Sequence, residues 1–138
     1  MTSHFDFSDE GFVQALERCT LDPKLFSHEA HLRLAWLQIR KNGIERAILE
    51  IGRILPQYVA SLGVKDKYNL TITIAAIKAV DHFMKRSATS NFKDFIQENP
   101  RLKYNFRELL GYHYSENIFT SEKAKTEYME PDLLRFES

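Results

Sequence analysis

The chain contains little of what disulfide-bonded, membrane-spanning or nucleic-acid-binding proteins need. Cys19 is its one cysteine, which excludes a disulfide within the chain. No apolar run approaches the roughly 20 residues of a bilayer-spanning helix. Lysine plus arginine equals aspartate plus glutamate at 19 each, so the excess positive charge that favours nucleic acids or anionic membranes is missing. The N-terminal residues also lack a secretory signal pattern. We therefore expect a cytoplasmic protein with no nucleic-acid or membrane partner.

Strand patterns are scarce as well. Apolar and polar residues rarely alternate between tight-turn pairs, whereas helix-capping residues recur every ten to twenty positions. Hydrophobic residues make up 43% of the chain, and a domain of this size buries roughly 70% of its unfolded surface without needing a disulfide. The sequence therefore predicts an all-α protein: one domain over residues 1–138, folded as a compact bundle of about five to seven helices with a buried central helix.

Capping residues predict where the first helices begin and end. Ser8 caps a first helix, and Ser27 caps a second over 28–42 that Gly43 stops. A third helix is expected over 44–62. Pro56 lies inside it and removes a backbone donor, which predicts either a kink or two shorter helices.

The second half begins with the most apolar segment, 71–86, which is expected to be the central helix. Asn91 then caps a helix over 92–98. Pro100 opens a helix that is expected to run to Leu110, and Ser121 starts a last short one that ends at about residue 129.

His28 and His31 form the most suggestive pair for chemistry. Three positions apart on a helix, they share a face with Leu32 and Ala35, so both rings are expected to point toward the interior or into a cleft. Imidazoles there could transfer a proton, and both residues are candidate catalytic groups. The alternative is that both rings are hydrogen-bonded for structural reasons. A pair is too few ligands for a usable metal site, so none is predicted.

Two further polar clusters are candidate ligand contacts. Tyr68, Asn69, Thr71 and Thr73 lie at the start of the apolar fourth helix, where the helix N-terminus favours a carboxylate or phosphate. The alternative is that Asn69 caps the helix and the threonines complete its first turn, with no ligand. Tyr114 and Ser115 form the second cluster, for which aromatic packing in the core is the alternative. Trp36, on the inward face of the second helix, is the remaining candidate contact.

Three segments resemble a family of small, mostly uncharacterised bacterial proteins. The family's Phe-x-His-x-x-His-Leu/Val-Arg-x-Ala-Trp segment matches Phe26 to Trp36. Its Tyr-His-Glu-Thr-x-Thr segment is matched at Tyr68, Thr71 and Thr73. A tail similar to Tyr-Ser, Ser-x-x-Ala and Pro-Asp-Leu is matched by Tyr114, Ser115, Ser121, Ala124, Pro131, Asp132 and Leu133.

The resemblance covers most of the chain and implies that these three segments meet in the fold. The resemblance implies no particular reaction for this chain. Asn69 and Leu70 stand where the family pattern has histidine and glutamate, and leucine neither titrates nor ligates a metal. If those two family residues complete a metal or acid–base site, this chain has lost part of that site, which implies binding without catalysis.

Three hypotheses of function follow. The leading one is a pocket for a small molecule between the second helix and the start of the central helix, with His28 and His31 as hydrogen-bonding or proton-transfer groups. The second is a helical interaction protein without a pocket, and the third is a degenerate metal-dependent enzyme. No cofactor, substrate or oligomeric state is indicated by the sequence.

Overall fold

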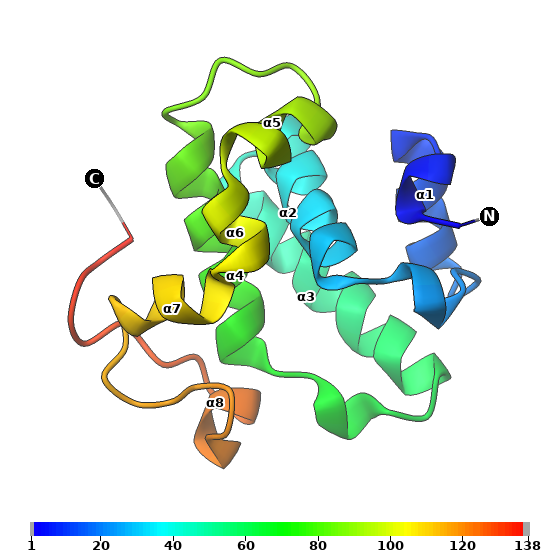
Figure 1. The fold of residues 1–138 in the computed structure, drawn as a ribbon. Coiled ribbons are helices and arrows are strands. Elements are labelled where there is room, and N and C mark those ends of the chain that lie inside the picture. The colour runs from blue at the N-terminus through cyan, green and yellow to red at the C-terminus, as the bar shows by residue number, and fades with distance from the viewer. Residues whose placement is uncertain (1, 137–138) are drawn as a thin grey trace. The chain divides into compact units, whose positions relative to one another are not determined.

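The computed structural model describes residues 2–136, which form eight α-helices and three short 3-10 helices (Figure 1). Within this part of the chain there is no β-strand, so the all-α prediction is confirmed. The chain divides into two compact units, Met1–Tyr68 and Asn69–Ser138.

In the first unit, α2 and α3 pack side by side and α1 packs against α3 (Figure 1). The α-helices are α1 (Asp9–Glu17), α2 (His28–Asn42) and α3 (Ile44–Ser61). The 3-10 helices are η1 (His4–Asp6), η2 (Pro23–Leu25) and η3 (Lys65–Lys67). The fully buried large side chains here are Phe12, Leu16, Leu21, Leu32, Leu34, Ile51, Ile54 and Tyr58.

The helix boundaries of this unit follow the capping residues. The Ser8 hydroxyl accepts a hydrogen bond from the Gly11 amide at 3.0 Å, and the Ser27 hydroxyl accepts one from the Ala30 amide at 3.2 Å. Gly43 ends α2 with a φ of 82°, a backbone conformation that favours glycine. These predictions are confirmed. Pro56 lies within α3, which is continuous, so the alternative of two separate helices is wrong.

The second unit contains α4 (Leu70–Met84), α5 (Phe92–Glu98), α6 (Pro100–Tyr104), α7 (Phe106–Gly111) and α8 (Glu122–Thr126). Every residue of α4 is buried or half-buried, as expected for the most apolar segment. The short helix α8 packs against α4, and α5, α6 and α7 follow one another as a chain of short helices (Figure 1).

Two predicted helices are wrong in extent. The single helix expected from Pro100 to Leu110 is divided at Asn105, which ends α6 and precedes α7 with a φ of −129°. Asparagine competes for backbone hydrogen bonds and favours such helix ends. The last helix stops at Thr126, before the predicted end, because the following residues bond to α4: the Met129 amide donates to the Thr71 hydroxyl at 3.1 Å.

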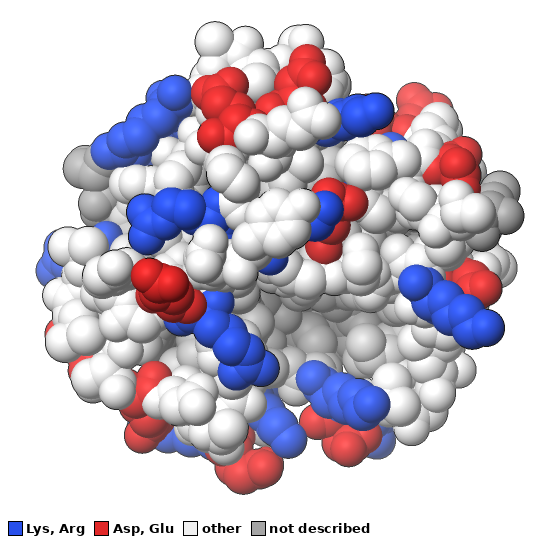
Figure 2. All heavy atoms as spheres, viewed as in Figure 1, with Lys and Arg blue, Asp and Glu red and all other residues white. Residues whose placement is uncertain are grey.

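Lysine and arginine side chains are interspersed with aspartate and glutamate on the face shown in Figure 2, in keeping with the balanced charge of the chain. Over residues 2–136, none of the helices combines the length and apolarity needed to cross a bilayer.

Candidate functional site

His31 lies in an apolar environment in the first unit. Its ring centroid is 5.7 Å from that of Phe26, and Phe26 in turn meets Tyr58 edge-on at 5.4 Å. The His31 Nε2 atom is buried and has no hydrogen-bond partner among residues 2–136. Desolvation, and after it the charge of His28, lower the pKa of His31 to about 4. The imidazole is therefore neutral at neutral pH.

His28 corrects the prediction that both rings point inward, because its side chain is exposed. His28 is the first residue of α2, and a side chain in a first turn projects toward the end of the helix. The sequence pattern was also ambiguous, since every residue from Leu32 to Trp36 is buried. A helix buried on all sides has no single apolar stripe from which to assign the faces of its first turn.

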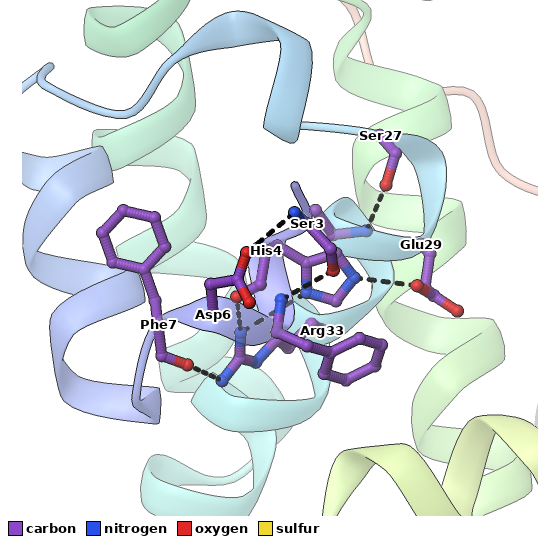
Figure 3. A network of polar contacts seen from close by, with 9 residues as sticks. Ser3, His4, Asp6, Phe7, Ser27, Glu29 and Arg33 are labelled. Atoms are coloured by element: carbon purple, nitrogen blue, oxygen red, sulfur yellow. Dashed lines mark hydrogen bonds and ion pairs between the residues drawn. The ribbon is translucent and has the colours of Figure 1, made fainter. Parts of the chain in front are cut away.

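Between the two histidines, Glu29 belongs to a polar network that sequence analysis missed (Figure 3). A Glu29 carboxylate oxygen lies 2.9 Å from Nε2 of His4, and the His4 side chain is only 3% exposed. The two residues are 25 positions apart. No local pattern joins them, so only the tertiary structure reveals the pair.

Arg33 is the centre of this network (Figure 3). Its Nη1 donates to the His4 carbonyl at 2.6 Å, and its Nη2 donates to the Phe7 carbonyl at 3.0 Å and to the Asp9 carboxylate at 2.9 Å. The guanidinium also lies 4.7 Å from the centre of the Phe12 ring. Arg33 is buried, so these contacts attach the N-terminal segment to α2 and give it a structural role.

Trp36 and Tyr68 are the other predicted contacts in the first unit. Trp36 is buried, with the Arg40 guanidinium 5.0 Å from the centre of its ring. Tyr68 follows η3 and is half-buried, with its hydroxyl out of contact with solvent. A role of either residue in ligand binding stays a prediction.

In the second unit, the polar groups at the start of α4 bond to the protein itself. Asn69 caps the helix, accepting from the Ile72 amide at 2.9 Å, and its Nδ2 donates to the Ile118 carbonyl at 3.0 Å. The Thr71 hydroxyl donates to the Glu127 carbonyl at 2.9 Å. The Thr73 hydroxyl donates to the Asn69 carbonyl at 2.8 Å. This geometry favours the capping interpretation over a ligand.

Tyr114 and Ser115 line one pocket of about 410 Å³ within the second unit. Tyr114 is buried, and desolvation raises the pKa of its phenol, with the neighbouring Tyr128 hydroxyl as the next cause. Ser115 bonds to Asp132 through both its amide, at 2.9 Å, and its hydroxyl. The serine hydroxyl is thus engaged by a carboxylate, which holds the C-terminal segment in place.

A larger pocket, of about 580 Å³, lies elsewhere in the same unit. It is half-open, and the part of its lining that the structure describes combines basic with apolar side chains and contains no carboxylate. Its lining comes from the C-terminal half of α4 and the turn after it, from α6 and α7, and from two segments that follow α7: Ala79, His82, Phe83, Arg86, Arg101, Leu109, Tyr112, His113, Leu134, Arg135 and Phe136. None of these residues was a predicted site residue.

His113 fixes one wall of this larger pocket. Its ring stacks on Phe136, with centroids 4.0 Å apart, and its Nδ1 lies 2.6 Å from the Leu134 carbonyl oxygen. The Leu133 amide donates to the His113 carbonyl at 3.0 Å. These contacts hold the extended C-terminal segment against α7 and shape the pocket.

His82 lines the same pocket from α4. It is half-buried, and desolvation is the main cause that lowers its pKa, followed by the charge of Arg86. Its Nδ1 lies 3.3 Å from Nη1 of Arg86. The neutral ring accepts a hydrogen bond at Nδ1 from that guanidinium.

The described residues contain no group of three histidine, cysteine, aspartate or glutamate side chains arranged to hold a metal ion. No protein-family model, curated protein or solved structure matches the chain. The resemblance to the bacterial family therefore stays a prediction.

Proposed function

We propose that the protein binds a small molecule, and that the binding site is the 580 Å³ pocket of the second unit. One observation carries this proposal: two histidines, three arginines and a set of apolar side chains converge on one half-open pocket. Ligand sites have volumes of about 300–1,000 Å³ and combine apolar walls with a few convergent polar groups. The pocket fits this description.

The proposed pocket is lined by histidines, as the sequence predicted, but they are not His28 and His31. His82 and His113 line the pocket, whereas His31 has its free nitrogen shut away from solvent. A proton-transfer group must lie within hydrogen-bond reach of its substrate. The geometry therefore gives no support to His31 as a catalytic base, and we propose binding rather than catalysis.

Histidine ring signals in NMR spectra test this proposal, because the two sites involve different histidines. A fragment library is titrated into the intact protein while the ring signals of all five histidines are followed. We expect binders to shift His82 and His113 and to leave His31 unchanged. Shifts confined to His28 and His31 would instead favour the site predicted from the sequence. A library that shifts no ring would contradict small-molecule binding.

Exposed apolar side chains favour a second candidate function, a protein-interaction module. Tyr112, Leu133 and Leu134 are 54%, 59% and 60% exposed, and two of them also line the pocket. Light scattering distinguishes the two functions, since an interaction module that pairs with itself forms a complex that Leu133→Ser weakens. A monomer whose pocket binds fragments would reject this candidate.

We also propose that residues 1–138 behave as one domain, with α4 as its central helix. No residue of α4 is fully exposed, which supports a central position for this helix. Urea unfolding followed by far-ultraviolet circular dichroism and by Trp36 fluorescence tests it, because a single domain gives coincident transitions. Two separate transitions would contradict it.

A further inference from the structure

The larger pocket concentrates positive charge in a chain that has none in excess. Arg86, Arg101 and Arg135 all line it, and among residues 2–136 no aspartate or glutamate does. Over the whole sequence, 19 basic residues balance 19 acidic ones. Three guanidinium groups around one half-open hollow repel one another, and a low-dielectric wall strengthens their field. An anion bound among these groups would reduce the repulsion between them.

The nearby carboxylates do not neutralise these arginines. Asp81, beside His82 on α4, pairs with Lys85 at 3.1 Å. Glu98 accepts a hydrogen bond from the Ser87 hydroxyl at 3.2 Å. Among residues 2–136, no carboxylate lies within ion-pair distance of any of the three arginines. Their charges are therefore available to a ligand.

The Arg86 guanidinium is anchored through one of its three nitrogen atoms. Its Nη1 donates to the His82 carbonyl at 3.2 Å and lies 3.3 Å from His82 Nδ1. Within the described chain, its Nη2 and Nε have no acceptor. One side of the guanidinium is thus anchored to α4, while two N–H groups on the other side remain for a carboxylate or phosphate, which this planar group binds in a bidentate manner.

Arg101 is positioned in a different way. Its guanidinium lies 5.8 Å from the centre of the Tyr112 ring, a cation–π arrangement, and its N–H donors have no acceptor within the described part of the chain. Phe83 and Leu109 add an apolar wall to the same pocket. A bare inorganic ion would leave these surfaces uncovered, whereas a ligand with a flat or apolar body would bury them.

We infer that the pocket binds an organic anion, a carboxylate or phosphate ester carrying a flat apolar group, with Arg86 and Arg101 as the anion-binding residues. This inference rests on the proposed small-molecule function and specifies its ligand class. Arg135 adds charge from the C-terminal segment, and the Phe83 and Tyr112 rings pack against the apolar body. His82 acts as a positioning residue that anchors Arg86.

Calorimetric titration of the intact protein tests the inference with three probes. Phenyl phosphate carries both features, benzyl alcohol carries the ring without the charge, and inorganic phosphate carries the charge without the ring. We expect phenyl phosphate to bind at least about tenfold more tightly than either of the others, and its affinity to fall as salt is raised. Equal binding of phenyl phosphate and benzyl alcohol would overturn the anion inference yet leave the small-molecule function standing. Binding of none would overturn both.

Arginine variants identify the residues responsible. Arg86→Gln and Arg101→Gln are each expected to weaken phenyl phosphate about tenfold, the loss typical of one charge-assisted hydrogen bond, and to leave benzyl alcohol unchanged. Arg107→Gln is the matched control: it removes the same charge from the same unit, but its guanidinium stacks on Phe119 at 4.1 Å, outside this pocket. An equal loss in the control would assign the effect to general charge and overturn the inference.

His82→Gln tests the positioning role separately. If His82 only anchors Arg86, its loss weakens phenyl phosphate and not benzyl alcohol, and the combined His82→Gln, Arg86→Gln variant is no weaker than Arg86→Gln alone. Additive losses would contradict the positioning role. A long single-stranded oligonucleotide that binds more tightly than phenyl phosphate would show a polyanion surface instead and would overturn the inference.

Discussion

Arg33 in the first unit and Arg86 in the second show how the surroundings of one residue type set its role. The Arg33 guanidinium is buried and donates to two carbonyls and a carboxylate. Arg86 is exposed, and its one engaged nitrogen bonds only to His82, one helical turn away. A guanidinium surrounded by acceptors stabilises the fold, whereas one that lacks them at the rim of a pocket is free to bind a ligand.

The histidines differ between the units in the same way. His31 packs against the Phe26 ring, and its buried Nε2 atom has no hydrogen-bond partner among residues 2–136. His113 uses its Nδ1 to bind the Leu134 carbonyl while its ring forms part of a pocket wall. Arg33 and the His31 Nε2 atom are thus buried in the first unit, whereas Arg86 and His113 line a pocket in the second. Four predictions test this contrast.

The largest effect is expected from Arg33→Met. The substitution leaves the His4 and Phe7 carbonyls and the Asp9 carboxylate without their donor, so the free energy of unfolding should fall by about 2–4 kcal/mol. Urea denaturation measures the loss. Arg46→Met, which removes an exposed arginine from α3, is the control and should change stability by less than about 0.5 kcal/mol. Similar losses of stability in the two variants would contradict a structural role specific to the buried arginine.

Next in size is the acid sensitivity conferred by His31. The pKa of His31 is about 4 in the folded protein and 6.5 when unperturbed. Between these two pH values the imidazole is mostly protonated in the unfolded chain and mostly neutral in the folded protein. Stability is therefore fully present above about pH 6.5 and is lost as the pH falls toward 4, by roughly 2–3 kcal/mol. Urea denaturation at several pH values measures the slope.

The control for that slope is His31→Phe, which keeps an aromatic ring of similar shape and cannot titrate. The variant should be at least as stable as the natural protein near pH 5 and should show a flatter acid limb. An unchanged slope would assign the acid sensitivity to other groups and show that the His31 environment is not the cause.

A smaller loss is expected from Thr71→Val in the second unit. The hydroxyl both donates to the Glu127 carbonyl and accepts from the Met129 amide, so its removal leaves two backbone groups unpaired and should lower stability by about 1–3 kcal/mol. Hydrogen exchange at the Met129 amide should accelerate. Thr73→Val is the matched control, because Thr73 bonds only to a carbonyl within its own helix turn; a larger effect there would contradict this order.

The smallest effect on stability is expected from Arg86→Met. The Arg86 guanidinium bonds only to His82, four residues earlier in the chain, so the free energy of unfolding should change by less than about 0.5 kcal/mol. The same variant should lose affinity for phenyl phosphate, as measured by calorimetry. A stability loss as large as that of Arg33→Met would mean that the two arginines have the same role.

Local hydrogen bonding explains why so many helix ends were predictable. The caps at Ser8, Ser27, Asn69 and Asn91 each bond to an amide three residues ahead, a distance visible in the sequence. The break at Asn105 and the early end of α8 were missed because residue types there also permit a helix. The end of α8 is set instead by tertiary contacts such as the hydrogen bond from the Met129 amide to the Thr71 hydroxyl.

The candidate site was predicted less well. Asn69 was recognised as a possible cap, and Tyr114 and Ser115 do line one pocket together. His28, however, is exposed, because α2 is buried on so many sides that periodicity could not assign its first turn to a face. The larger pocket was missed because its residues carry no common motif.

The sequence alone determined the all-α class and most helix boundaries, since capping and helical periodicity act over three or four residues. Only the tertiary structure decided which polar groups are satisfied and which face a hollow. Arg86 and Arg135 are far apart in the chain, and both line the same pocket. Whether a guanidinium bonds to a carboxylate or lines a pocket depends on how distant segments pack, and no short stretch of sequence contains that information.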